Sequence, residues 1–221
     1  MKEKILMSWS GGKDSAVALW ELQRAGEYEI DALLTSVTEG YDRISMHGVR
    51  NELLERQAAA LGVPLERVQL PKLASNEVYE ERMGAAMNAA KARGISRVAF
   101  GDLYLEGIRS YREENLARVG MEALFPVWLR ETRQFAKDFL SAGFRTMVVC
   151  VDTAQLGAEF AGREIDEAFL AELPEGVDPC GEKGEFHTFV FDGPNFSEPV
   201  KFELGETRID GQFHFRDLVP S

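Results

Sequence analysis

The sequence has few cysteines and no long apolar run. Its 221 residues include only two cysteines, Cys150 and Cys180, so we expect no disulfide framework. No apolar stretch approaches the length of a membrane span, and residues 1–4 lead straight into the first expected strand. We therefore expect neither a signal peptide nor a membrane segment, and we predict a cytoplasmic localisation.

Basic side chains are also scarce: 25 Lys and Arg stand against 37 Asp and Glu, which gives a net charge of −12. Proteins that bind nucleic acid through its phosphates usually carry a cluster of Lys and Arg, and none is visible here. We therefore expect no nucleic-acid partner. A small anion is still compatible with this charge, because salt screens it over about 8 Å, whereas a binding loop acts at hydrogen-bond range.

What the sequence does contain is an alternation of strand and helix patterns, followed by a different C-terminal part. The alternation predicts an α/β domain with a parallel sheet and right-handed crossovers. From Pro174 onward, short strand-like pieces predict a smaller α+β domain, and we place the division between residues 1–125 and 126–221. Strands are expected at residues 5–9, 30–37, 67–70, 98–100, 144–151, 186–191, 200–204 and 213–215, and helices at 16–25, 49–61 and 76–93.

The first expected strand ends in a glycine-rich turn, Ser10-Gly11-Gly12-Lys13-Asp14-Ser15, which leads into a helix. Adjacent glycines let backbone N–H groups approach an anion, and the positive end of the helix favours it. Lys13 adds a mobile positive charge, Ser10 and Ser15 add hydroxyl donors, and Asp14 suits the Mg²⁺ that accompanies nucleotides. The turn predicts a phosphate-binding loop, although Ser and Asp are also the usual residues of an ordinary helix N-cap.

The spacing of this turn excludes two commoner phosphate-binding loops. A Walker A loop would need a glycine at the position of Met7, and a dinucleotide-binding loop would need a third glycine. The turn resembles instead the S-G-G-x-D-S loop (PP-loop) of the ATP pyrophosphatases. That resemblance implies that the loop binds the β,γ-pyrophosphate of ATP and releases it while AMP is transferred to a substrate.

Two further loops are expected beside the first, because open parallel sheets bind ligands at the carboxyl ends of their strands. One includes Ser45-Met46-His47, and the other begins Gly101-Asp102. Asp102 is placed to reach Mg²⁺ or a hydroxyl, and a turn aspartate would look the same. His47 is a candidate to polarise a phosphate or take a proton, but lone histidines also occupy structural positions.

Arg109 and Arg112 stand three residues apart, which places them on one face of a helix. Together they would hold a carboxylate or a phosphate. A solvated helix has the same pattern of charges, so the sequence leaves this alternative open.

The C-terminal block from Asp178 to Phe189 is dense in polar groups. Its glycines alone would suit a β-hairpin turn. They do not explain Glu182, Glu185 and His187, which stand immediately before an apolar strand. Paired carboxylates bind Mg²⁺ or an ammonium ion, so the block predicts a second part of the site.

The combination of these segments resembles the diphthine–ammonia ligase family, in particular its bacterial-type relatives, over nearly the whole chain. The most specific parts are the two terminal blocks; the others are residues 45–47, Gly101-Asp102 with Arg112 and Glu114, and Pro126 with Trp128. The resemblance implies a HUP-like (Rossmann-like) nucleotide-binding α/β domain with a smaller α+β C-terminal domain. It also implies a ligase that uses ATP to adenylate a carboxylate, after which ammonia displaces AMP to give an amide.

One residue departs from the pattern of that family, because Lys183 stands where an asparagine is usual. An asparagine side chain both donates and accepts hydrogen bonds, whereas lysine only donates and carries a charge. Acceptor specificity is therefore expected to differ here if that amide orients the acceptor.

These observations and the resemblance together assign roles to individual residues. Lys13, Asp14, Arg112, Glu182 and Glu185 are the predicted catalytic residues, and Asp14 and Asp102 are the predicted Mg²⁺ ligands. The predicted ATP-binding residues are Ser10, Gly11, Gly12, Lys13, Asp14, Ser15, His47, Gly101 and Asp102.

The expected partners are ATP, free ammonium and a carboxylate acceptor, on a small molecule or on a modified protein side chain. A homo-oligomer is compatible with the sequence, and the identity of the acceptor stays open. One alternative is a tRNA-modifying ATP pyrophosphatase that inserts sulfur, which would need a persulfide or an iron–sulfur cluster, and Cys180 has no C-x-x-C partner. Another alternative is a nucleotide sensor that does not turn ATP over, which would have no use for a second acidic block.

Overall fold

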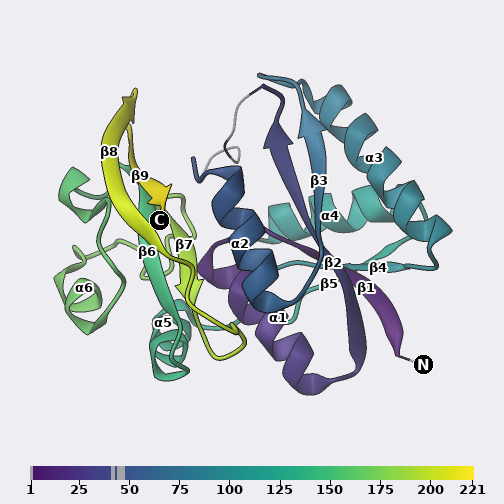
Figure 1. The fold of residues 1–221 in the computed structure, drawn as a ribbon, viewed down its shortest axis with the longest axis horizontal. Coiled ribbons are helices and arrows are strands. Elements are labelled where there is room, and N and C mark those ends of the chain that lie inside the picture. Colours follow the sequence, from purple (N-terminus) through teal and green to yellow (C-terminus); the bar gives the residue numbers. More distant parts are fainter. Residues whose placement is uncertain (1, 41–42, 44–47) are drawn as a thin grey trace. The chain divides into compact units, whose positions relative to one another are not determined.

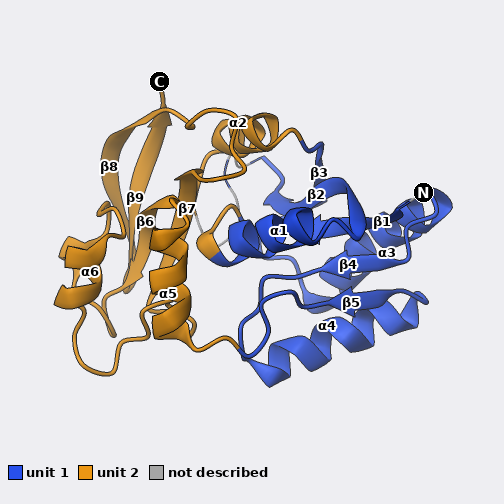
Figure 2. Ribbon diagram, turned by 90° about the horizontal axis from the view of Figure 1, so that it is seen from below, with its two compact units in different colours: residues 1–10, 14–45, 63–129 blue, residues 11–13, 46–62, 130–221 orange. Residues whose placement is uncertain are grey.

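A computed structural model describes residues 2–40, 43 and 48–221 of the chain (Figure 1). The chain divides into two compact units, which are coloured separately in Figure 2. The first unit contains residues 1–10, 14–45 and 63–129, and the second unit contains residues 11–13, 46–62 and 130–221. None of the helices in the described ranges is both long and apolar enough to cross a membrane.

The first unit is built on a parallel sheet with strand order β3-β2-β1-β4-β5. The strands are β1 (Glu3–Ser8), β2 (Tyr28–Thr38), β3 (Leu65–Leu70), β4 (Arg97–Ala99) and β5 (Glu122–Leu124), and the helices are α1 (Lys13–Ala25), α3 (Asn76–Ala92) and α4 (Glu106–Arg118). The predicted Rossmann-like α/β architecture is confirmed. The strand order changes direction between β1 and β4, and in open α/β sheets this switch point is where ligands bind.

The core of the first unit explains why these segments fold as they do. Leu6, Leu34 and Val98 point from the sheet toward one face, where they pack against Met87 of α3 and Leu116 of α4. The helix α1 lies on the opposite face of the same sheet (Figure 2). Strands covered by helices on both faces need continuous apolar runs, which is the pattern that identified them in the sequence.

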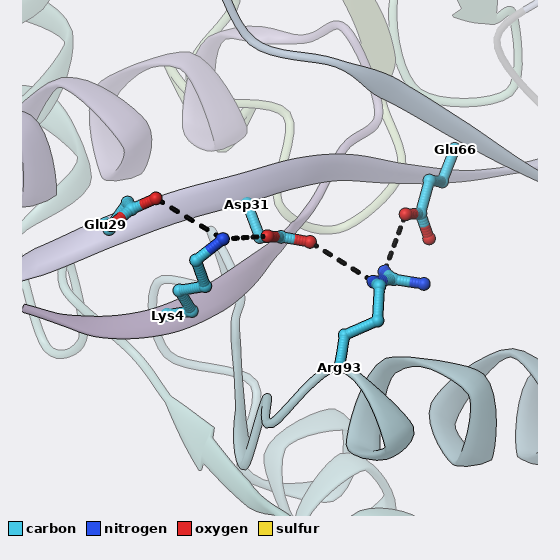
Figure 3. Close-up of polar contacts among 5 residues, drawn as sticks. All are labelled: Lys4, Glu29, Asp31, Glu66 and Arg93. Carbon is cyan, nitrogen blue, oxygen red and sulfur yellow. Dashed lines mark hydrogen bonds and ion pairs between the residues drawn. The ribbon is translucent and has the colours of Figure 1, made fainter.

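A network of ion pairs joins the amino ends of three strands in the first unit (Figure 3). Lys4 lies 3.0 Å from Asp31 and 3.5 Å from Glu29, and Arg93 lies 3.4 Å from Asp31 and 2.6 Å from Glu66. Exposed ion pairs of this kind contribute little to stability individually. They stand at the edge of the sheet opposite to the carboxyl ends, so they are separate from the expected site.

The second unit is built on an antiparallel sheet with strand order β7-β6-β9-β8. The strands are β6 (Arg145–Asp152), β7 (Phe186–Asp192), β8 (Phe202–Asp210) and β9 (Phe213–Pro220), and the helices are α2 (Asn51–Leu61), α5 (Thr132–Ser141), the 3-10 helix η1 (Ala158–Phe160) and α6 (Glu167–Glu172). The α+β C-terminal part predicted from the sequence is confirmed. The strand expected at residues 200–204 is longer and begins at Phe202.

Two segments of the predicted domain 1–125, residues 11–13 and 46–62, belong to the second unit. Hydrogen bonds that reach far along the chain explain their placement. The buried amide of Gln57 in α2 donates to the carbonyl oxygens of Gly11 (3.0 Å) and Val190 (2.5 Å). Arg50 also forms a two-armed salt bridge with Asp217, with a shortest distance of 2.6 Å. A division based on sequence composition has no access to such contacts.

Candidate functional site

The segment from Ser10 to Ser15 joins β1 to α1 as a turn whose shape requires glycine. Gly11 has a φ of 78°, and a Cβ on it would lie 2.9 Å from Oε1 of Gln57. Its carbonyl oxygen accepts hydrogen bonds from Nε2 of Gln57 (3.0 Å) and from the backbone N–H of Val190 (2.9 Å). The turn is therefore held in a fixed shape by groups distant in the sequence, as a binding loop needs to be.

Lys13 lies where this turn meets the C-terminal block. Its backbone N–H donates to the hydroxyl of Thr188 (3.1 Å), and its side chain is only 5% exposed. The ammonium group lies 5.9 Å from the centre of the Phe186 ring. Thr188 thus satisfies one of the first N–H groups of α1 from a position 175 residues away. No local sequence signal identifies Thr188 in this role.

His187 stands beside Lys13 and is uncharged at neutral pH. Burial, together with the positive charge of Lys13, lowers the pKa of its imidazole to about 4. A neutral imidazole accepts a hydrogen bond or a proton through one ring nitrogen. Lys13 of the N-terminal turn thus lies beside His187 and Thr188 of the C-terminal block.

The loop after β4 packs directly on the first turn of α1. A Cβ on Gly101 would lie 2.6 Å from the carbonyl carbon of Asp14 and 2.7 Å from the backbone nitrogen of Ser15. The hydroxyls of Ser10 and Ser15 lie 3.1 Å apart in the same region. The structure therefore brings together two of the three loops expected here. The third, Ser45-Met46-His47, lies outside the described residues.

Asp102 and Arg112 form a two-armed salt bridge. Nε of Arg112 lies 2.6 Å from Oδ2 of Asp102, and Nη2 donates to Oδ1 over 3.2 Å. The guanidinium also lies over the ring of Phe100, 4.4 Å from its centre. One carboxylate oxygen of Asp102 thus accepts a hydrogen bond from Arg112, whereas Oδ2 is buried beside Nε without a hydrogen bond.

Arg109 has a separate set of partners. Its Nε donates to Glu113 (2.8 Å), and its guanidinium lies 4.9 Å from the centre of the Phe125 ring and 4.8 Å from that of Trp128. Arg109 and Arg112 therefore contact different carboxylates and different aromatic rings. Arg112 alone lies beside the loop that follows β4.

Glu185 holds the C-terminal block in its shape. Its side chain is 1% exposed, and its two oxygens accept hydrogen bonds from the backbone N–H groups of Asp178 and Lys183, each over 2.9 Å. Glu182 is half-buried, and Lys183 is exposed. The two acids that sequence reasoning treated as a pair thus occupy different environments, and the contacts of Glu185 support a positioning role for it.

Both cysteines are buried. The thiol of Cys180 donates to the carbonyl oxygen of Thr132 (3.2 Å), and burial raises the pKa of the Cys150 thiol to about 12. Thiols in such surroundings are poor nucleophiles, because the thiolate is the reactive form. Within the described ranges, no three His, Cys, Asp or Glu side chains are grouped so as to hold a metal ion.

These groups fit a nucleoside triphosphate and its metal ion. Gly11 gives the turn its positive φ, and the positive charge of the buried residue Lys13 suits a phosphate group. Mg²⁺ is usually held by one or two carboxylates together with substrate phosphates and water. Asp14, on the first turn of α1, supplies such a carboxylate. The donor set therefore needs no further protein ligand.

Comparison with known proteins assigns the chain to a family. Sequence models match at residues 1–123, described as the diphthamide synthase N-terminal domain, and at residues 131–217, described as the diphthamide synthase C-terminal domain. A protein of Danio rerio named diphthine–ammonia ligase is 26% identical and aligns over 90% of this chain and 86% of its own length. The human protein of the same name is 25% identical over 90% and 83%.

Two solved structures align with part of this chain at low similarity. One is a "predicted subunit of tRNA methyltransferase" from Methanocaldococcus jannaschii, with 19% identity, a TM-score of 0.42, and coverage of 66% of this chain and 78% of that chain. The other is the U34-tRNA thiolase NcsA from Methanococcus maripaludis, with 15% identity, a TM-score of 0.38, and coverage of 63% and 56%. Similarity at this level supports no conclusion about activity. The two matched domains, which together span most of the sequence, show that this chain belongs to the diphthamide synthase family and is an enzyme similar to diphthine–ammonia ligases.

Proposed function

We propose that this protein is an ATP-dependent ligase that converts a carboxylate into an amide, with ammonia as the nitrogen donor and AMP and pyrophosphate as products. The observation that carries the proposal is the buried residue Lys13 in a turn that requires glycine and follows the central strand β1 of a parallel sheet. Membership of a family whose named relatives are diphthine–ammonia ligases supports the same reaction class.

In the first step, an oxygen of the acceptor carboxylate attacks the α-phosphorus of ATP. The bond from that phosphorus to the oxygen bridging to the β-phosphate breaks, and pyrophosphate leaves with the electron pair. The segment Ser10–Ser15 binds the departing pyrophosphate, and Lys13 offsets the negative charge that develops on it. Asp14 would hold Mg²⁺, with Asp102 as the second candidate, and the ion neutralises phosphate charge when bound.

In the second step, the lone pair of ammonia attacks the carbonyl carbon of the adenylated acceptor. The bond from this carbon to the oxygen of AMP breaks, AMP leaves, and the nitrogen loses one proton. The neutral imidazole of His187 and the half-buried carboxylate of Glu182 lie in the C-terminal block that contacts Lys13, and they are the candidates to bind the nitrogen donor. Glu185 keeps that block in place.

Isotope transfer tests the adenylation step directly. The enzyme is incubated with ATP, Mg²⁺, ammonium chloride and a panel of carboxylic acids, and pyrophosphate release is measured. For any acid that stimulates release, a sample labelled with ¹⁸O in its carboxylate must deliver one labelled oxygen to AMP. Formation of ADP and phosphate, or of AMP without label, would refute the proposal. AMP without label would also favour simple hydrolysis of ATP.

Lys13→Met tests the loop while keeping an apolar chain in the buried position. We expect pyrophosphate release to fall by about 10²-fold or more, because a buried charge at the leaving group is lost. Lys137→Ala removes an exposed lysine on α5 and serves as the control for a general loss of positive charge. An unchanged rate in Lys13→Met would exclude the proposed role of the loop.

A further inference from the structure

A cavity of about 210 Å³ opens in the first unit between α3, α4 and the sheet. Leu34 and Val98 of the sheet, Met83 and Met87 of α3, and Leu116 of α4 give it an apolar interior. An apolar cavity of about 150 Å³ is large enough to hold a benzene molecule. The space is therefore suited to a ring or a short branched chain.

Polar side chains converge on this cavity. Ser8, Tyr79, Tyr111, Arg112 and Asn115 all line it. Burial raises the pKa of the Tyr79 hydroxyl, which is thus a hydrogen-bond donor at neutral pH, and the charge of Arg112 partly opposes that shift. Within the residues that the structure describes, the Tyr79 hydroxyl and the Asn115 amide make no hydrogen bond. An apolar cavity with a few convergent polar groups is the usual form of a small-molecule site.

Arg112 gives the cavity a cationic edge. Of the five N–H donors that a guanidinium carries, one on Nη2 donates to Asp102, and the buried Nε makes an ion-pair contact with Asp102 but no hydrogen bond. The guanidinium lies on the ring of Phe100, which also lines the cavity. These donors suit the planar oxygen pair of a carboxylate.

The cavity adjoins the loop that we assign to ATP. Ser8 is the last residue of β1, and the chain continues from it into Ser10. Phe100 is followed by Gly101, whose Cα packs on the backbone of Asp14 and Ser15. A carboxylate at Arg112 would therefore stand at the same end of the sheet as the phosphates.

We propose that this cavity is the acceptor site: it binds the apolar body of a small carboxylic acid, and Arg112 presents the carboxylate to ATP. The identity of the ligand as the acceptor rests on the proposed function. Adenine is a poorer match, because most of the lining residues lie in strands and helices, whose backbone groups are hydrogen-bonded within those elements. Side chains alone then contact the ligand. Glu80 and Arg118, which also line the cavity, pair with each other over 3.1 Å, so the Arg112 guanidinium is the group that favours an anion over an uncharged ring.

Gly84 allows the cavity to be filled in a controlled way. It lies in α3, lines the cavity, and a Cβ on it would meet no atom within 4 Å. Gly84→Phe therefore places a ring in the cavity, and Gly84→Ala adds only a methyl group. Ala89→Phe is the matched control, because it adds the same ring at an exposed position of the same helix.

Binding of phenylacetate, with uncharged phenylacetamide as the comparison, measures the proposed specificity. Titration calorimetry is carried out in the presence of Mg²⁺ and a non-hydrolysable ATP analogue. The wild type is expected to bind phenylacetate about tenfold more tightly than phenylacetamide, because only the carboxylate forms a charge-assisted pair with Arg112. Gly84→Phe is expected to lose phenylacetate binding, whereas Gly84→Ala and Ala89→Phe retain it, and all four proteins bind the ATP analogue equally.

Three results would overturn the assignment of the acceptor site. They are equal affinities for phenylacetate and phenylacetamide, phenylacetate binding that is retained in Gly84→Phe, and loss of ATP-analogue binding in Gly84→Phe. Loss of ATP-analogue binding would mean that the cavity holds the adenine base of ATP. Arg112→Gln provides a test that does not depend on Gly84→Phe folding, because it must abolish the preference for the acid while keeping the weaker amide binding. If phenylacetate binds as expected but no acid stimulates pyrophosphate release, the proposed function fails while the carboxylate site stands.

Discussion

Substitution of Gly101 by alanine tests how the ATP loop is supported. The added Cβ would lie 2.6, 2.7 and 2.8 Å from three backbone atoms of Asp14 and Ser15, where contacts of 3.4 Å or more are ordinary. The two backbones would have to separate by about 0.8 Å. Because these atoms belong to the first turn of α1, they yield less readily than the end of a flexible side chain.

The expected cost is that of overpacking a tight contact, about 1–3 kcal/mol in the free energy of unfolding. The same movement displaces Asp14 and Ser15, so affinity for a non-hydrolysable ATP analogue should fall about tenfold, or about 1.4 kcal/mol. Urea denaturation measures the first effect, and titration calorimetry measures the second.

Gly107→Ala is the matched control for this experiment. Gly107 lies in α4, and a Cβ on it would meet no atom within 4 Å. Alanine there should leave ATP binding unchanged and raise the stability by up to about 1 kcal/mol, because it reduces the entropy of the unfolded chain. If Gly101→Ala behaves like Gly107→Ala in both assays, the loop after β4 does not support the ATP loop.

Two further predictions concern the C-terminal block. The folded state holds the pKa of His187 at about 4, below the ordinary 6.5, so only the unfolded chain takes up this proton between those values. The free energy of unfolding should therefore fall by at most about 3 kcal/mol as the pH drops from 6.5 to 4. This contribution should be absent in His187→Gln. Urea denaturation of the wild type and the variant at several pH values measures the difference. In Glu185→Gln, an amide NH₂ faces a backbone N–H in place of a carboxylate oxygen, so stability should fall by about 1–3 kcal/mol at pH 7. Glu182→Gln, at a half-buried position, should change it by less than about 0.5 kcal/mol, and equal effects of the two substitutions would contradict the positioning role of Glu185.

The contacts of Glu185 change what its substitution can show about the reaction. A buried carboxylate that binds two backbone N–H groups shapes the loop that carries Lys183 and leads into His187. Loss of amide formation in a Glu185 variant would therefore not identify a catalytic group by itself. Unaltered ATP binding and an unaltered free energy of unfolding would be needed alongside it.

Local patterns in the sequence predicted most elements of the first unit. The buried strands appear as apolar runs, and Ser75 marks the start of α3 by accepting a hydrogen bond from the backbone N–H of Val78 (3.4 Å). The strand β5 and the helices α5 and α6 were not predicted: β5 and α6 have only three and six residues, whereas α5 does carry helical spacing in Phe135, Ala136 and Phe139. A glycine-rich turn between a strand and a helix was visible because its requirement for glycine is local.

The sequence by itself determined the alternation of strands and helices, the PP-loop turn and the kinship with the diphthamide synthase family. Only the tertiary structure decided that Thr188 caps the backbone of Lys13, that Gly101 packs on Asp14 and that residues 11–13 and 46–62 belong with the second unit. It also showed that Arg112 is bound to Asp102 beside an apolar cavity. The reason is physical: periodicity and turn chemistry act between near neighbours, whereas the partner of a buried polar group is chosen by packing between segments far apart in the chain.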